Sequence, residues 1–150
     1  MNTRGFALAE LMVVLAVAAV LATFVAPTLW SYARTAALQA AARELATSIN
    51  LGRQIAISRN TTVCVAVASA KTIRLRTGGC GGAVWIGPGT DGSGAISISD
   101  ASALHISTTA NVVFTSLGAA SPAGTYTLTD PVNNGTRTVV VAATGRVSVR

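Results

Sequence analysis

One carboxylate lies inside a long apolar stretch near the N-terminus. Between Phe6 and Leu29 the polar residues are Glu10, Thr23 and Thr28. A charged side chain in a bilayer costs about 2.5–3.5 kcal/mol on insertion scales, and such residues usually have a function. Glu10 is therefore either a functional group or a side chain that reaches water near the cytoplasmic interface.

Residues suited to catalysis or to metal binding are sparse. His105 is the single histidine, and it lies in an alternating segment typical of an exposed strand. No serine has the surroundings of a nucleophile elbow. The segment 87–92 has the spacing G-x-G-x-x-G, but it contains a proline and precedes no helical pattern, and Asp91 alone is too few carboxylates for calcium. We expect no enzyme activity, no cofactor and no metal.

Two cysteines follow the apolar stretch, Cys64 and Cys80. Both therefore lie on the same side of a membrane, and in the oxidising periplasm a disulfide is the simplest interpretation. A disulfide that closes the loop between these cysteines would stabilise the part of the chain after the apolar stretch by about 3 kcal/mol in the chain-entropy model. The alternative, a metal site, needs more ligands than two thiols and the distant His105.

The C-terminal segment 145–150 contains two arginines at strand spacing. A strand would place Arg146, Ser148 and Arg150 on one face and two valines on the other. Arginines on a sheet edge would contact phosphates without reading a base sequence. The alternative is an edge strand protected by its charges. Three further arginines would extend this patch if they are near in space: Arg74, Arg76 and Arg137.

The N-terminal half of the chain must supply one long helix. Residues 6–29 would span about 36 Å as a helix, enough for a hydrocarbon core of roughly 30 Å. An amphipathic pattern continues beyond them. We predict one helix from Ala7 to Ser58, ending near Asn60, whose second half lays an apolar stripe against the head. The stripe consists of Leu38, Ala42, Leu45, Ile49 and Ala56.

After residue 60 the hydrophobic period changes to two, with β-branched residues and turn signals. This pattern predicts an α+β fold in which a small antiparallel β head packs on the long helix. The predicted strands are 62–67, 72–76, 83–86, 95–99, 104–108, 112–115, 124–128, 137–142 and 146–149.

The composition is apolar and basic. Hydrophobic residues make up 51% and charged residues 11%, which excludes a disordered chain. The net charge of +6 permits binding to DNA or to anionic surfaces but does not require it.

The N-terminus resembles the class III leader of type IV prepilins and pseudopilins. The segment 1–5 is a short basic leader ending in Gly5, Phe6 follows, and Glu10 is fifth in the chain that starts at Phe6. The resemblance implies that a prepilin peptidase cuts between Gly5 and Phe6 and methylates the new amino group of Phe6. It also implies that Glu10 pairs with this ammonium group on a neighbouring subunit, which sets the register of the filament.

The head is similar to the GspH/FimT family of minor pilins and pseudopilins. The similarity rests on Cys64, on Cys80 with Trp85 soon after it, and on the terminal segments 137–141 and 145–147. FimT-like competence pilins have a Gly-Arg-x-Arg tail implicated in DNA binding. This chain has Ser148 where the second arginine of that tail would stand.

We therefore expect four parts: a leader at 1–5, a transmembrane and filament-core helix at 6–29, an amphipathic helix at 30–60 and a GspH/FimT-like head at 61–150. The expected function is that of a minor pilin or pseudopilin in a type IV pilus or a type II secretion pseudopilus. Its partners would be the prepilin peptidase, other pilins and the inner membrane, with a single pass and the head in the periplasm or in a surface pilus. The alternative is a competence pilin that binds DNA for uptake.

Overall fold

The computed structural model describes residues 4–98 and 104–150, with the backbone alone at 4–7 and 24–28. The chain divides into two compact units, Met1–Ala36 and Ala37–Arg150. Part of the predicted leader, residues 1–3, lies outside the described residues, as does Ser99 at the end of a predicted strand.

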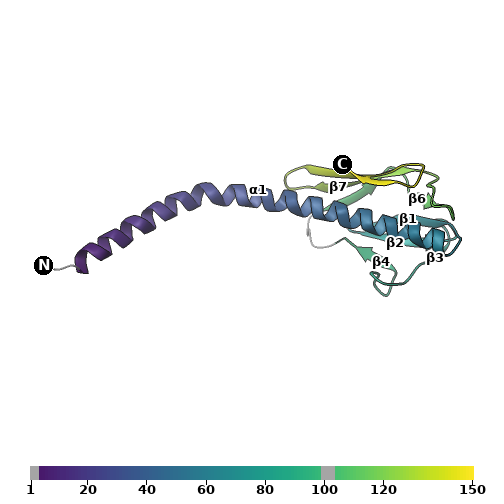
Figure 1. The fold of residues 1–150 in the computed structure, drawn as a ribbon, viewed down its shortest axis with the longest axis horizontal. Coiled ribbons are helices and arrows are strands. Elements are labelled where there is room, and N and C mark those ends of the chain that lie inside the picture. Colours follow the sequence, from purple (N-terminus) through teal and green to yellow (C-terminus); the bar gives the residue numbers. More distant parts are fainter. Residues whose placement is uncertain (1–3, 99–103) are drawn as a thin grey trace. The chain divides into compact units, whose positions relative to one another are not determined.

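A single helix, α1 (Arg4–Ser58), runs through both units (Figure 1). It begins three residues before the predicted start and ends where predicted. Asn60 adopts a left-handed conformation with φ of 47°, and the N–H of Thr61 donates to the carbonyl of Ala56 at 3.0 Å. This arrangement satisfies a carbonyl that the end of the helix leaves free.

The first unit exposes apolar side chains. Glu10 is the one charged residue between residues 8 and 23, and large hydrophobic side chains in this stretch are 54–68% exposed, such as Val17 and Met12. Within the described residues, no helical stretch meets the length and hydropathy needed to cross a membrane. An apolar surface of this kind calls for a covering partner.

The head contains two antiparallel sheets (Figure 1). The first sheet has the order β3 (Ala83–Val84), β2 (Thr72–Thr77), β1 (Val63–Ser69) and β6 (Val112–Phe114), and β4 (Ala95–Ser97) also pairs with β2. The second sheet has the order β5 (His105–Thr108), β7 (Gly124–Asp130), β8 (Gly135–Val141) and β9 (Val147–Val149).

All nine predicted strands are present, with shifted ends. The strand predicted at 83–86 stops after two residues, and the one predicted at 124–128 extends to Asp130. The division into two sheets was not predicted, because alternation identifies strands without identifying their partners.

The core lies between the C-terminal half of α1 and the strands. All five residues of the predicted apolar stripe are buried, with 0–3% of their surface exposed. The helix approaches the first sheet closely at Gly52, where a Cβ atom would lie 3.1 Å from methyl groups of both Leu75 and Val65. A glycine at this position therefore permits the tight contact between helix and sheet.

Candidate functional site

The N-terminal candidates lie on α1. Glu10 is exposed on the helix, in the midst of exposed apolar side chains. The backbones of Gly5 and Phe6 are helical, and the side chain of Phe6 is outside the described residues. The predicted ion pair joins two subunits, so it stays a prediction.

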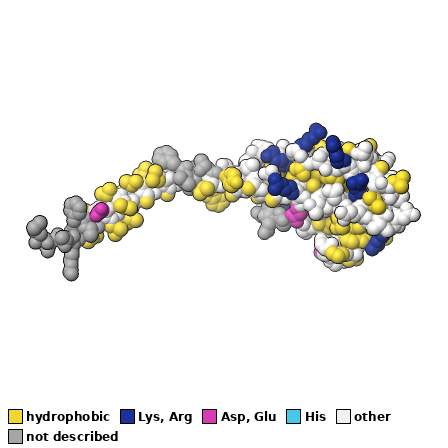
Figure 2. Space-filling view, in the orientation of Figure 1, with side chains coloured by type: hydrophobic (Ala, Val, Ile, Leu, Met, Phe, Trp, Pro, Cys, Tyr) yellow, Lys and Arg dark blue, Asp and Glu magenta, His cyan; other side chains and the backbone are white. Residues whose placement is uncertain are grey.

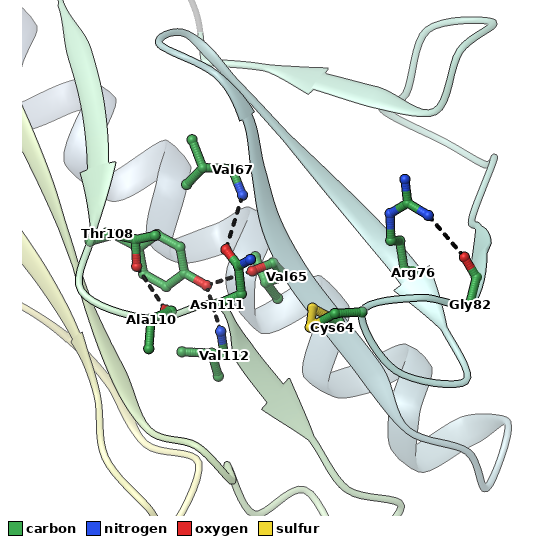
Figure 3. The surroundings of a disulfide bond; sticks show 11 residues. Cys64, Val65, Val67, Arg76, Gly82, Thr108, Ala110, Asn111 and Val112 are labelled. Carbon is green, nitrogen blue, oxygen red and sulfur yellow. Dashed lines mark hydrogen bonds between the residues drawn. A yellow bond between two sulfur atoms is a disulfide. The ribbon is translucent and has the colours of Figure 1, made fainter.

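The disulfide between Cys64 and Cys80 is present, which confirms that prediction (Figure 3). Cys64 is fully buried in β1, whereas Cys80 is exposed in the glycine-rich loop after β2, and their Cα atoms are 4.9 Å apart. The N–H of Gly78 also donates to the carbonyl of Thr62 at 2.8 Å. The disulfide therefore fixes the glycine-rich loop to β1, at the centre of the first sheet.

Arg74 and Arg76 of the first sheet each form a hydrogen bond to a loop of the head. Arg76 donates from Nη1 to the carbonyl of Gly82 at 3.0 Å (Figure 3), and Arg74 donates from Nη2 to the hydroxyl of Ser93 at 3.3 Å. Both side chains are half-buried. Each guanidinium is thus committed, at least in part, to positioning a loop of the head.

Asp91 organises the loop before β4. Its Oδ1 accepts hydrogen bonds from the N–H of Ala95 and from the N–H and hydroxyl of Ser93, each at 2.8 Å. The bond from Ala95, followed by the hydroxyl of Ser93, lowers the pKa of this carboxyl below its ordinary value. Asp91 therefore acts as a turn residue, and these hydrogen bonds account for the position of its carboxylate.

The C-terminal arginines lie on the outer face of the second sheet. Val139 and Val141 of β8 point into the core. Ser148 is opposite Val140, and Arg150 exchanges two backbone hydrogen bonds with Thr138. Since directly opposed residues share a face, the register places Ser148 and Arg150 away from the core. This confirms the predicted alternation.

The register separates the predicted arginines. Arg146 and Arg150 are exposed on the outer face of the second sheet, whereas Arg137 is in line with Val139, on the side that faces the core. Arg74 and Arg76 belong to β2 of the first sheet. Basic side chains gather on the face of the head shown in Figure 2, but the strands place the five arginines on at least three sheet faces.

Tyr126 is a residue whose role the sequence did not reveal. It is fully buried in β7. Its hydroxyl donates to the carbonyl of Val65 at 2.8 Å and accepts from the N–H of Val112 at 3.1 Å. Burial raises the pKa of this phenol to about 12. The alternating pattern marks Tyr126 as a core aromatic but gives no sign that it joins the two sheets.

Arg53 was also not singled out by its sequence position. Its Nε donates to the carbonyl of Gly118 at 2.9 Å. Gly145, with φ of 79°, packs so closely on this carbonyl that a Cβ atom would overlap it. A side chain of α1 thereby fixes the turn that leads into β9 and Arg146.

Comparison with known proteins identifies the family. A family model described as Type II transport protein GspH matches residues 41–145. The chain belongs to the GspH family. A second model, the prokaryotic N-terminal methylation motif, matches residues 1–26. Both resemblances inferred from the sequence are thus confirmed. No curated protein sequence matches the chain.

Two solved structures, one of a minor pilin and one of a minor pseudopilin, share the fold. The type IV minor pilin FimU of Pseudomonas aeruginosa is 17% identical, with 79% of this chain and 92% of FimU covered and a TM-score of 0.57. The minor pseudopilin EpsH from the type 2 secretion system of Vibrio cholerae is 9% identical, with 75% of this chain and 95% of EpsH covered and a TM-score of 0.58. The GspH family member described here therefore has the type IV pilin-like α+β fold.

Proposed function

We propose that this GspH family member is a structural subunit, a minor pilin or pseudopilin, built into a type II secretion pseudopilus or a type IV pilus. The observation that carries the proposal is the N-terminal methylation motif over residues 1–26 on the same chain as a GspH head at 41–145. A prepilin peptidase would cut between Gly5 and Phe6 and methylate Phe6. Residues 6–29 would hold the subunit in the inner membrane, with the head in the periplasm, until assembly.

The exposed apolar surface of the first unit supports this proposal. Side chains such as Leu11, Val14 and Leu15 are 57–60% exposed and would be covered by lipid before assembly and by neighbouring helices afterwards. Glu10 would then lie among apolar groups, where a carboxylate is tolerated only with a cationic partner. The ammonium group of Phe6 on a neighbouring subunit supplies that partner.

An assembly assay tests the proposal. Glu10→Gln removes the charge with little change in shape, so we expect incorporation into sheared filaments to fall at least about tenfold, whereas Glu10→Asp should keep part of it. Membrane levels of the subunit serve as the control for expression. Unchanged incorporation of Glu10→Gln would contradict the role given to the carboxylate.

The filament system is decided by the phenotype of a deletion strain. Loss of exoprotein release with normal piliation indicates a pseudopilus, and loss of piliation or twitching indicates a pilus. Complementation with the unaltered chain and with the Glu10→Gln variant ties either phenotype to assembly.

A second candidate function is DNA capture by the head. It is favoured by the exposure of Arg146 and Arg150 on a sheet face whose other side chains are mainly hydroxyls. Hydroxyls and guanidinium groups are the usual contacts to phosphate. Of the other candidates, Arg137 is on the opposite side of that sheet, and Arg74 and Arg76 hold loops of the first sheet. Arg146 and Arg150 are therefore the residues to test.

Salt-dependent binding to duplex DNA distinguishes DNA capture from a purely structural role. Replacing both Arg146 and Arg150 by alanine should lower the slope of log K against log salt by roughly 2, since each phosphate contact contributes about 0.9. Arg59→Ala is the matched control, because it removes an exposed charge at the end of α1. Equal slopes for the double variant and the control would remove the DNA proposal.

A further inference from the structure

Strand β9 is an edge of the second sheet, and among the described residues no strand pairs with its outer side. Thr138 and Arg150 exchange backbone hydrogen bonds at 2.9 and 2.8 Å. In an antiparallel ladder such pairs alternate with pairs whose N–H and C=O groups point away. Val147 and Val149 occupy the alternate positions, and no hydrogen bond from the described residues reaches their outward groups.

Three other edge strands of the head are closed by the chain itself. At β4, Asp91 binds both backbone groups of Ala95, accepting from its N–H at 2.8 Å and donating to its carbonyl at 2.9 Å. At β5, the N–H of Ile106 donates to the carbonyl of Ala70 at 2.7 Å. At β6, the N–H of Ser121 donates to the carbonyl of Val113 at 2.8 Å. The open edge at β9 therefore contrasts with the protection of these three strands.

The charges at β9 restrict what can pair with it. Arg146 and Arg150 are at the two ends of the edge and on the same face. If β9 of a second copy paired with it antiparallel about Ser148, Arg146 of one chain would lie directly opposite Arg150 of the other. Like charges directly opposed across strands are destabilising, so self-pairing is disfavoured and acidic partners are favoured.

We propose that β9 is a docking edge that receives an extended segment with acidic side chains from a different subunit of the filament. This inference rests on the proposed function as a filament subunit. The incoming strand would exchange hydrogen bonds with Val147 and Val149, while its acidic side chains would lie beside Arg146 and Arg150. Backbone pairing supplies the attraction and the two arginines select the partner.

Two synthetic peptides test the edge. One is a short strand of alternating valine and threonine with a glutamate at each end, and the other has a lysine at each end. With the full chain in detergent micelles, NMR amide exchange at Val147 and Val149 should slow at least about tenfold with saturating acidic peptide and remain unchanged with the basic one. Equal slowing by both peptides, or by neither, would overturn the proposal.

Two variants separate backbone pairing from simple charge attraction. Val149→Pro removes an outward N–H without removing a bond to β8, so the acidic peptide should no longer slow exchange at Val147. Val149→Thr keeps this N–H and is the matched control. Reversal of both charges in Arg146→Glu/Arg150→Glu should transfer the protection to the basic peptide. If Val149→Pro still gains full protection, the edge is not the binding element.

The outcome is distinguishable from failure of the proposed function. Glu10 reports on assembly and is remote in sequence from β9. Loss of filament incorporation in Glu10→Gln, together with absent peptide protection at Val147 and Val149, would remove the docking edge alone. Peptide protection with normal incorporation of Glu10→Gln would instead leave the edge and remove the proposed assembly role of Glu10.

Discussion

The hydroxyl of Tyr126 joins the two sheets of the head. Replacing Tyr126 by phenylalanine leaves the carbonyl of Val65 and the N–H of Val112 buried without this partner. We expect the free energy of unfolding to fall by about 1–3 kcal/mol. Urea unfolding of the full chain in micelles measures this change. Tyr32→Phe, at an exposed tyrosine of α1, should leave the stability unchanged.

The raised pKa of Tyr126 also predicts that the protein loses stability at alkaline pH. The folded state holds its pKa near 12, and an unfolded tyrosine has a pKa of about 10. Below pH 10 both states are protonated, so the contribution is intact. Between about pH 10 and 12 the unfolded state loses the proton first, and stability should fall by up to about 3 kcal/mol. Tyr126→Phe should lack this component, and parallel pH curves for the two proteins would contradict it.

At the residue scale, the sequence predicted residue types that have a recurrent local pattern. The spacing of Gly5, Phe6 and Glu10 needs no tertiary information, and neither does the pairing of two available cysteines. The roles of Tyr126 and Arg53 were not predicted, because each depends on a backbone group more than 60 positions away in the chain. No local pattern identifies such a partner.

At the scale of elements, Gly52 sets the distance between α1 and the first sheet. Gly52→Leu would force a branched side chain against Leu75 and Val65, whose methyl groups lie 3.1 Å from even a Cβ atom. We expect a cost of about 1–3 kcal/mol from overpacking. Thermal unfolding measures it, with Thr47→Leu on an exposed position of α1 as control. An equal effect of both substitutions would show that the close approach is unimportant.

The disulfide predicts a separate change in stability. Reducing the bond between Cys64 and Cys80 should lower the free energy of unfolding by about 2–4 kcal/mol, since the loop spans 16 positions. Denaturant unfolding with and without reductant gives the difference. A Cys64→Ala/Cys80→Ser variant should match the reduced protein and be insensitive to reductant. Equal stability of the oxidised and reduced chains would contradict this contribution.

The elements themselves were predictable, but their pairing was not. β1 and β2 were predicted as two strands, and the short turn between these two alternating segments lets them pair as a hairpin. β6 pairs with β1 rather than with its sequence neighbour β5, which belongs to the other sheet. Such partners are chosen by packing on α1 and by contacts such as the Tyr126 hydroxyl, which alternation alone does not encode.

At the scale of the whole molecule, the two units differ in how their apolar groups are satisfied. The head buries its hydrophobic side chains within itself, whereas residues 8–23 expose theirs. The same chain thus carries a GspH head and an N-terminal methylation motif. This division fits the proposed role of a subunit that moves from a membrane into a filament.

The most direct test is the N-terminus of the protein in its native host. Mass spectrometry of the chain recovered from sheared filaments should find Phe6 as the first residue, with a methylated amino group. The peptides that contain Cys64 and Cys80 should be joined by a disulfide and should separate only after a reductant is added. Gly5→Leu should leave the leader in place and abolish incorporation. Filaments that contain the unaltered chain starting at Met1, or normal incorporation of the Gly5→Leu variant, would contradict the account of this protein as a processed pilin-like subunit.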